Sequence, residues 1–193
     1  MRCKPPTTRP CSPSPARLGD TLPLLVRTYR IRNRPGSVDE LAFFCELPSI
    51  ELAIHYAALA TDRRGKRFSH QCRISLATLR KAKAALEACA PQISRSQSFH
   101  ALHQLVREIL QAIRGVGELY VYDTALRLGA FLRVSPEHVY LHAGTRAGAR
   151  ALGLDLSEGF VRVASLPKPI QTLRPHEIED FLCIYKGQLT SEG

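Results

Sequence analysis

Two glycines separated by one aliphatic residue, Gly115-Val116-Gly117, mark a tight turn between two stretches of helical apolar periodicity. Glycine reaches positive φ without a steric penalty and lets other groups approach the backbone closely. The aliphatic residue between the glycines can point inward and hold the two helices together. Arg114 directly precedes the turn and adds a positive charge. These residues predict a tight turn between two helices.

A second glycine-rich stretch runs from His142 to Gly153. Gly144 and Gly148 lie four residues apart among alanines, which would give a helix a smooth face for close packing against another helix. Alternatively, Thr145 and Arg146 at the start of that helix can bind an anion through backbone N–H groups, hydroxyl and guanidinium. The Gly-Lys-Ser/Thr ending of a phosphate-binding P-loop is missing. The sequence leaves both interpretations open.

Positive charge is concentrated in two segments of this chain, whose formal net charge is +10. Eight basic residues precede Gly36, with Asp20 as the one acidic residue among them. The second segment lies between Asp62 and Lys83, and the rest of the chain is acidic on balance. A solvated surface is one interpretation, but segregated charge favours a surface that contacts phosphates. The second segment contributes Arg63, Arg64, Lys66, Arg67, Arg73, Arg80, Lys81 and Lys83.

Other residue patterns narrow the range of functions. The six cysteines are scattered without a Cys-x-x-Cys pair, which indicates free thiols in a reducing cytoplasm. His100 and His103 have a spacing that can share a metal ion, but no carboxylate or cysteine cluster stands nearby in the sequence. We therefore expect no metal and no cofactor. No apolar run approaches the roughly 18 residues of a membrane span, and the N-terminal residues lack an apolar signal core. We expect a cytoplasmic protein without a membrane partner.

The periodicity predicts an all-α fold, with six to eight helices in one compact domain over residues 37–193. Residues 1–36 are rich in proline and arginine and are expected to form a flexible basic arm. Ser37 and Glu40 have the spacing of a capping box at the first helix of the domain. The later helices are expected over residues 50–60, 74–90, 99–113, 120–132 and 175–185, with a short one after Pro136.

The helix–Gly-Val-Gly–helix pattern around residues 115–117 resembles the helix-hairpin-helix element of DNA-binding and DNA-repair proteins. The resemblance covers about 30 residues, and it implies that the turn offers backbone N–H groups to a phosphate. In the usual pattern an alanine of the second helix follows about three residues after the turn. Here the best match, Ala125, lies eight positions beyond Gly117.

The stretch from Val121 to Gly129 is similar to a segment of helix-hairpin-helix DNA glycosylases. In that family an aspartate of this segment stabilises a cationic sugar in the transition state, and Asp123 would match it, with Thr124 following. The same two residues can instead cap the second helix of the hairpin. The family's aspartate lies about twenty residues beyond its hairpin, whereas Asp123 lies six beyond Gly117. No lysine occurs between Lys83 and Lys168, where the family carries its Schiff-base lysine.

Three function classes follow from these patterns. The first is a nucleic-acid-binding protein that contacts phosphates without reading bases, with DNA preferred over RNA as the partner. The second is a protein–protein interaction scaffold without catalytic residues. The third is a DNA glycosylase-like enzyme using Asp123. The expected phosphate contacts are the eight basic residues of the second segment, together with Arg114, Gly115, Gly117, Thr145 and Arg146.

Overall fold

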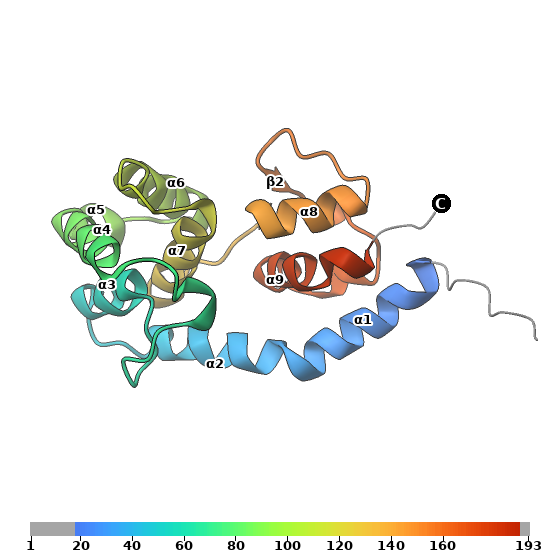
Figure 1. Ribbon diagram of the computed structural model, residues 1–193, viewed down its shortest axis with the longest axis horizontal. Helices are drawn as coiled ribbons and strands as arrows, with labels where there is room; N and C mark the ends of the chain where they lie inside the picture. The colour runs from blue at the N-terminus through green and yellow to red at the C-terminus, as the bar shows by residue number, and fades with distance from the viewer. Residues whose placement is uncertain (1–17, 190–193) are drawn as a thin grey trace, which may run out of the picture.

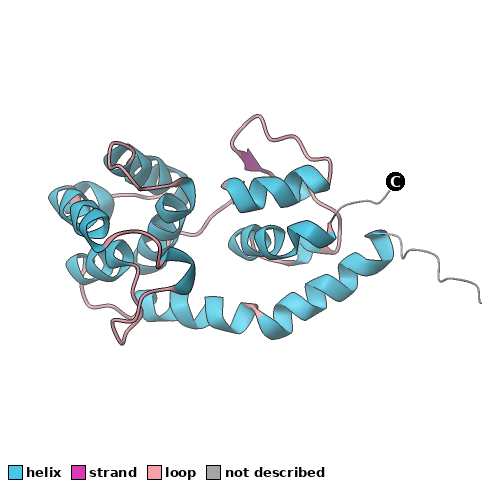
Figure 2. Ribbon diagram, viewed as in Figure 1, coloured by secondary structure: helices cyan, strands magenta, loops and turns pink. Residues whose placement is uncertain are grey.

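The protein is described here by a computed structural model in which residues 18–189 are placed. This part of the chain is mostly helical, with one two-stranded antiparallel sheet (Figure 2). Its α-helices are Leu18–Arg32 (α1), Arg34–Cys45 (α2), Ile50–Leu59 (α3), Leu76–Ala88 (α4), Ala90–Ser94 (α5), Phe99–Leu110 (α6), Glu118–Leu132 (α7), Ala143–Ala151 (α8) and Pro175–Tyr185 (α9). Short 3-10 turns cover Ser69–Gln71 (η1), Val163–Ser165 (η2), Ile170–Thr172 (η3) and Lys186–Gln188 (η4). The strands Val139–Tyr140 (β1) and Phe160–Val161 (β2) pair through Val139 and Val161. The predicted all-α class is confirmed in its broad sense.

The helices form two lobes, each with its own cluster of buried apolar side chains (Figure 1). The first lobe contains α2 to α7, and the second contains α1, α8 and α9 with the small sheet. The helix spacing within each lobe follows the apolar periodicity. In α6, for example, Leu102, Val106 and Leu110 are fully buried, while Arg107 and Gln111 are exposed. Serine side chains cap the start of several of these helices, including Ser98, whose hydroxyl accepts from the backbone N–H of Ala101 at 3.2 Å.

The first helix, α1, runs beneath α9 and joins α2, so that the chain starts in the second lobe and then builds the first (Figure 1). Leu22, Val26 and Tyr29 of α1 are buried in the second cluster. The Tyr29 ring meets the Phe181 ring edge to face, with centroids 6.0 Å apart. The predicted arm is therefore wrong for residues 18–36, which are helical except at Asn33. Residues 1–17, the rest of that arm, lie outside the described residues.

Two further expectations about helix boundaries need correction. Ser37 does not cap a helix, because α2 has already begun at Arg34 with Pro35 in its first turn. The segment after Pro136 is not helical but leads directly into β1. By contrast, α9 has the predicted bounds, Pro175 to Tyr185, and Glu177 accepts from the backbone N–H of Arg174 at 2.9 Å. Local capping signals were reliable where no long-range contact competed with them.

Close packing of α8 on α9 holds the second lobe together. A side chain added at Gly144 would overlap Cys183, and one added at Gly148 would overlap the backbone of Leu182. The interpretation of these two glycines as a smooth packing face is thereby confirmed. The same crossing buries Thr145 completely.

Candidate functional site: the α6–α7 turn and an adjoining cavity

The glycine turn joins α6 to α7 and begins the second of these helices. Gly115 has a φ of +92°, a left-handed conformation that favours glycine. A Cβ at Gly115 would lie 3.4 Å from the hydroxyl of Thr78 in the first turn of α4, so the turn packs against the start of that helix. Gly117 has an extended backbone and no neighbour near its Cα. As the residue before α7, it brings no side chain to cap the free N–H groups of the helix's first turn.

Part of the predicted basic surface surrounds this turn. Arg114 is exposed within it. Lys81 is exposed on α4, one helical turn beyond Thr78 and therefore on the same side of that helix as the contact with Gly115. Arg73 is exposed just before α4, and Arg80 is exposed beside Lys81. Segments 30 to 40 residues apart in the sequence thus bring positive charge to one place.

The remaining basic residues of that segment have other roles. Arg67 is half-buried and donates to the backbone carbonyls of Gln71 and Ile74, at 2.5 and 2.7 Å. Lys83 pairs with Glu87 at 2.8 Å. Arg63, Arg64 and Lys66 are exposed on the loop after α3, where Arg63 and Arg64 border a groove beside α2. The eight residues therefore do not form one surface with the glycine turn.

A cavity of about 480 Å³ opens beside the amino end of α7. It lies between the lobes, with walls from α6 and α7 on one side and from β1 and α8 on the other. Aromatic rings form part of the wall. The ring centroids of His103 and Tyr140 lie 4.6 Å apart, and those of Tyr122 and Tyr140 lie 6.1 Å apart. Its size is within the range of small-ligand sites, which are typically ~300–1,000 Å³.

Two arginines and one glutamate lie at the cavity. Arg107 of α6 is exposed and hydrogen-bonded to Gln104. Arg146 of α8 donates to both carboxylate oxygens of Glu118, at 3.0 and 3.2 Å. The hydrogen bond from Arg146 lowers the pKa of Glu118. Glu118 is the first residue of α7, so its negative charge also sits at the positive end of that helix dipole.

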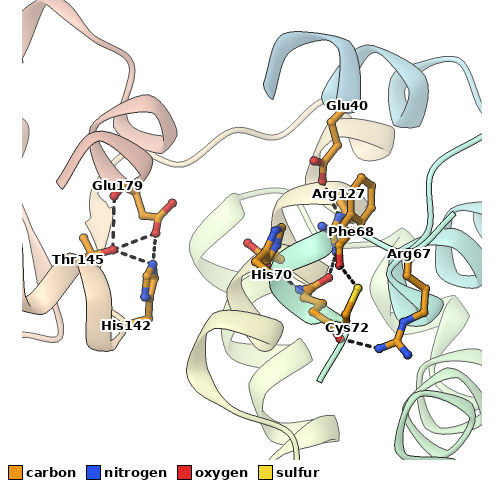
Figure 3. A network of polar contacts seen from close by, with 11 residues as sticks. Glu40, Arg67, Phe68, His70, Cys72, Arg127, His142, Thr145 and Glu179 are labelled. Carbon is orange, nitrogen blue, oxygen red and sulfur yellow. Dashed lines mark hydrogen bonds and ion pairs between the residues drawn. The ribbon is translucent and has the colours of Figure 1, made fainter. Parts of the chain in front are cut away.

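Thr145 does not bind an anion, contrary to one interpretation of the sequence. Its hydroxyl lies 2.7 Å from Nε2 of His142 and 2.9 Å from a carboxylate oxygen of Glu179 (Figure 3). His142 and Glu179 are also hydrogen-bonded to each other. Burial is the main cause that raises the pKa of the Glu179 carboxyl. These three side chains join the start of α8 to α9 and form the cavity wall at His142.

Asp123 belongs to a buried polar network within the first lobe. One of its oxygens lies 3.0 Å from Nε2 of His70 and accepts from the Gln71 amide at 2.6 Å. Gln71 in turn accepts from Arg127, which donates to Glu40 at 2.7 Å and lies against the Phe68 ring. The side chain of Asp123 is 13% exposed. The expectation that it caps α7 is wrong, because α7 begins five residues earlier.

This network also weakens the glycosylase-like interpretation. Within the described residues Asp123 does not line the interlobe cavity, and its carboxylate is already engaged by two donors. A carboxylate that stabilises a sugar cation has to face the substrate, and Asp123 instead positions His70 and Gln71.

Sequence reasoning missed the residues that build the cavity. The sequence analysis did not single out Tyr122 or Tyr140. It considered His103 only with His100 as a pair that could share a metal ion, and His142 only as the start of the glycine-rich stretch. One signal was available: His103, Arg107 and Gln111 recur every four residues, which places three polar side chains on one side of α6. The other side of the cavity comes from residues 139–146, which no local pattern connects to α6.

Comparisons with known proteins add no family: no protein-family model, no curated protein and no solved structure matches the chain. Within residues 18–189, no helix combines the length and apolar character needed to cross a membrane.

Proposed function

We propose that this protein binds nucleic acid, DNA in preference to RNA, through the phosphate backbone. The α6–α7 turn acts as a helix-hairpin-helix-like element, and the basic residues that precede Leu18 add positive charge. The observation that carries the proposal is the packing of Gly115 on Thr78. The contact supports the proposal because it brings the turn that carries Arg114 against the start of α4, and Lys81 lies one helical turn beyond Thr78 on that helix.

The chemistry of this surface suits phosphates rather than bases. Free N–H groups at a helix start and guanidinium or ammonium groups contact phosphate oxygens, which are the same at every base pair. Binding of this kind is independent of sequence and strongly dependent on salt. The free thiols of Cys45, Cys72, Cys89 and Cys183 fit the proposed location in a reducing cytoplasm.

Duplex binding measured against salt tests this proposal. The full-length chain is titrated into a fluorescent duplex, and into RNA of the same sequence, between 50 and 200 mM KCl. Arg114→Ala should lower affinity alike for unrelated sequences and reduce the salt slope by about one unit. Arg150→Ala is the matched control, because Arg150 is an exposed arginine of α8 in the other lobe. Equal losses in the two variants, or binding that does not depend on salt, would refute the proposal.

Binding of another protein is the second candidate function, because α1 and α2 carry a stripe of exposed apolar side chains. Leu24, Ile31 and Val38 follow each other at intervals of seven residues along α1 and α2, and their exposed fractions are 63%, 65% and 41%. Such spacing places apolar side chains on one side of a helical rod. Analytical ultracentrifugation of the triple alanine variant beside the parent would show whether the stripe mediates self-association.

A further inference from the structure

The stripe formed by Leu24, Ile31 and Val38 lies on the exposed side of α1 and α2. On α1 the buried side carries Tyr29, which packs against Phe181 of α9. Ile31 lies two residues beyond Tyr29, and two residues turn an α-helix by about 200°. Leu24 points in nearly the same direction as Ile31, because seven residues make almost two full turns. The stripe on α1 therefore faces away from α9.

The stripe continues across the junction of the two helices. The backbone N–H of Asn33 donates to the carbonyl of Tyr29 at 2.9 Å, as it would within a helix, and Asn33 keeps a right-handed helical backbone. The two helices thus form one bent rod along the edge of the molecule (Figure 1). The interval of seven residues therefore has the same meaning from Leu24 to Val38, over roughly 20 Å of helix.

Arginines lie beside this stripe. Residues 21–38 contain four arginines and no aspartate or glutamate. Arg27 lies three residues beyond Leu24, and Arg34 lies three residues beyond Ile31. Residues three apart are neighbours on the surface of a helix. Apolar and cationic residues therefore alternate along the rod, in the order Leu24, Arg27, Ile31, Arg34, Val38.

Arg27 differs from the arginines on either side of the junction. Arg34 pairs with Glu177 at 2.8 Å, and Arg30 donates to the backbone carbonyl of Thr172 at 3.0 Å, so both attach the rod to the second lobe. Arg27 is exposed, and within residues 21–189 it forms no hydrogen bond or ion pair. Its guanidinium is therefore available to a carboxylate of another molecule.

The alternation of apolar and cationic residues determines which molecule can cover the stripe. A second copy of this chain would place arginine beside arginine, whether the two rods ran parallel or antiparallel, and like charges disfavour such pairing. A nucleic-acid backbone would match the arginines and leave the apolar side chains in water. A helix whose apolar residues are flanked by carboxylates matches both features, and the interval of seven residues is that of paired helices.

We propose that this side of α1 and α2 binds an acidic amphipathic helix of another protein. The apolar side chains of the partner cover Leu24, Ile31 and Val38, and its carboxylates pair with Arg27. This inference rests on the second candidate function, for which it specifies the partner, and it does not depend on the phosphate surface around the α6–α7 turn.

Fluorescence anisotropy with a labelled synthetic helix tests this interface. The acidic probe has four heptads, each with one leucine, glutamates three and four residues beyond it, and alanine or glutamine elsewhere. The sister probe carries lysines in place of the glutamates. When the full-length chain is titrated into each probe at 50 mM KCl, the acidic probe should bind tenfold or more tightly than the lysine probe. Equal affinity for the two probes, or no binding of the acidic one, would overturn the proposal.

Two variants test the apolar contacts. Leu24→Ala and Ile31→Ala should each weaken binding of the acidic probe about threefold or more. Both side chains are exposed, so the thermal unfolding midpoint should change little. Leu52→Ala is the matched control, because Leu52 is 40% exposed on α3 in the first lobe, and it should bind the probe like the parent. Unchanged binding in Ile31→Ala would show that charge alone attracts the probe and would contradict the proposed contact.

Two arginines of α1 distinguish a specific ion pair from general attraction. Arg27→Glu should weaken binding of the acidic probe about tenfold and strengthen binding of the lysine probe. Arg32→Glu makes the same change of charge nearby, but Arg32 directly follows Ile31 and therefore points about 100° away from the stripe. Its effect should be threefold or less. Equal losses in the two variants would mean that the rod attracts any polyanion, and the proposal would be wrong.

Other occupants of the stripe would give different results. Vesicles of phosphatidylserine and phosphatidylcholine that displace the acidic probe would assign the stripe to a membrane surface and overturn the proposal. Self-association of the parent in the ultracentrifuge, lost in the triple alanine variant, would assign it to a second copy and overturn it as well.

The interface and the phosphate surface can fail separately. Arg114 lies in the first lobe, so Arg114→Ala should reduce duplex binding and bind the acidic probe like the parent. A parent that binds the acidic probe but no duplex would refute the phosphate surface alone. A parent that binds duplex but not the acidic probe would refute the interface alone.

Discussion

The backbone of Leu182 lies directly against Gly148, where α9 crosses α8. No side chain fits between them, because a Cβ at Gly148 would overlap the Leu182 carbonyl. The contact fixes the position of His142 and Arg146, which α8 and its start present to the cavity.

Gly148→Ala is expected to destabilise the protein by about 1–3 kcal/mol, because backbone atoms have to shift to admit the methyl group. Gly36→Ala is the matched control: its Cβ would meet nothing within 4 Å, and alanine favours the helix by several tenths of a kcal/mol. Urea denaturation of both variants and the parent measures the difference. A neutral Gly148→Ala would mean that the crossing of α8 and α9 is looser than described.

The two glycines of the turn should respond differently to substitution. Gly115→Ala forces a non-glycine residue to a φ of +92° and should cost about 1 kcal/mol or more. Gly117→Ser needs no unusual φ and supplies a hydroxyl cap to α7, which should raise stability by a few tenths of a kcal/mol. Thermal unfolding distinguishes the pair. The same Gly117→Ser cap would occupy helix N–H groups, so weaker duplex binding should accompany its higher stability.

Glu40 should matter more for stability than an ordinary surface glutamate. Its partner Arg127 is 1% exposed, and an arginine left there without a carboxylate keeps a buried positive charge. Glu40→Gln retains a hydrogen-bond acceptor and should still cost about 1–3 kcal/mol. Glu46→Gln is the control, because Glu46 directly follows the same helix at an exposed position. Chemical denaturation should separate the two variants, and equal midpoints would contradict the role assigned to this ion pair.

Buried histidines should make the protein sensitive to acid. Burial, and secondarily the charge of Arg174, lowers the pKa of His176 to about 4 from an ordinary value of 6.5. Between these values the unfolded chain binds a proton that the folded chain excludes, so the free energy of unfolding falls as pH drops from 6.5 towards 4. In His176→Gln the free energy of unfolding should fall less as the pH drops, and the difference from the parent should be on the order of 1–3 kcal/mol. Urea titrations at pH 7, 6 and 5 measure it, and parallel profiles would show that folding does not lower the pKa of His176.

Local sequence signals predicted much of the helical framework. Ser49, Ser98 and Pro175 start helices where capping rules place them, and the apolar repeats of α6 and α7 are buried as expected. The prediction failed at α1 because the proline-rich composition of the first residues indicated a flexible arm. Pro23 lies inside this helix and cannot donate a backbone hydrogen bond. The burial of Leu22, Val26 and Tyr29 in the second cluster outweighs that loss. The composition of a segment does not indicate packing against a helix about 150 residues away in the sequence, as between Tyr29 and Phe181.

The candidate site was only partly predictable for the same reason. The turn could be predicted, because Gly115-Val116-Gly117 stands between two stretches of helical apolar periodicity and Arg114 precedes it directly. The cavity depends on His103, Tyr122 and Tyr140 meeting across two lobes, and none of these residues has a spacing that predicts the others. Arg127 is the clearest example, because a charged residue is expected at the surface. In the structure it is buried against Glu40, Gln71 and Phe68.

The place of α1 in the second lobe has a consequence during synthesis. Its apolar side chains pack on α9, which is synthesised after α2 to α7, so those helices can assemble first. At a translation rate of roughly 5–20 residues per second, α1 waits on the order of 10–30 seconds for its partner. During that interval Leu22, Val26 and Tyr29 are exposed on the nascent chain, which makes this helix the segment most in need of a chaperone.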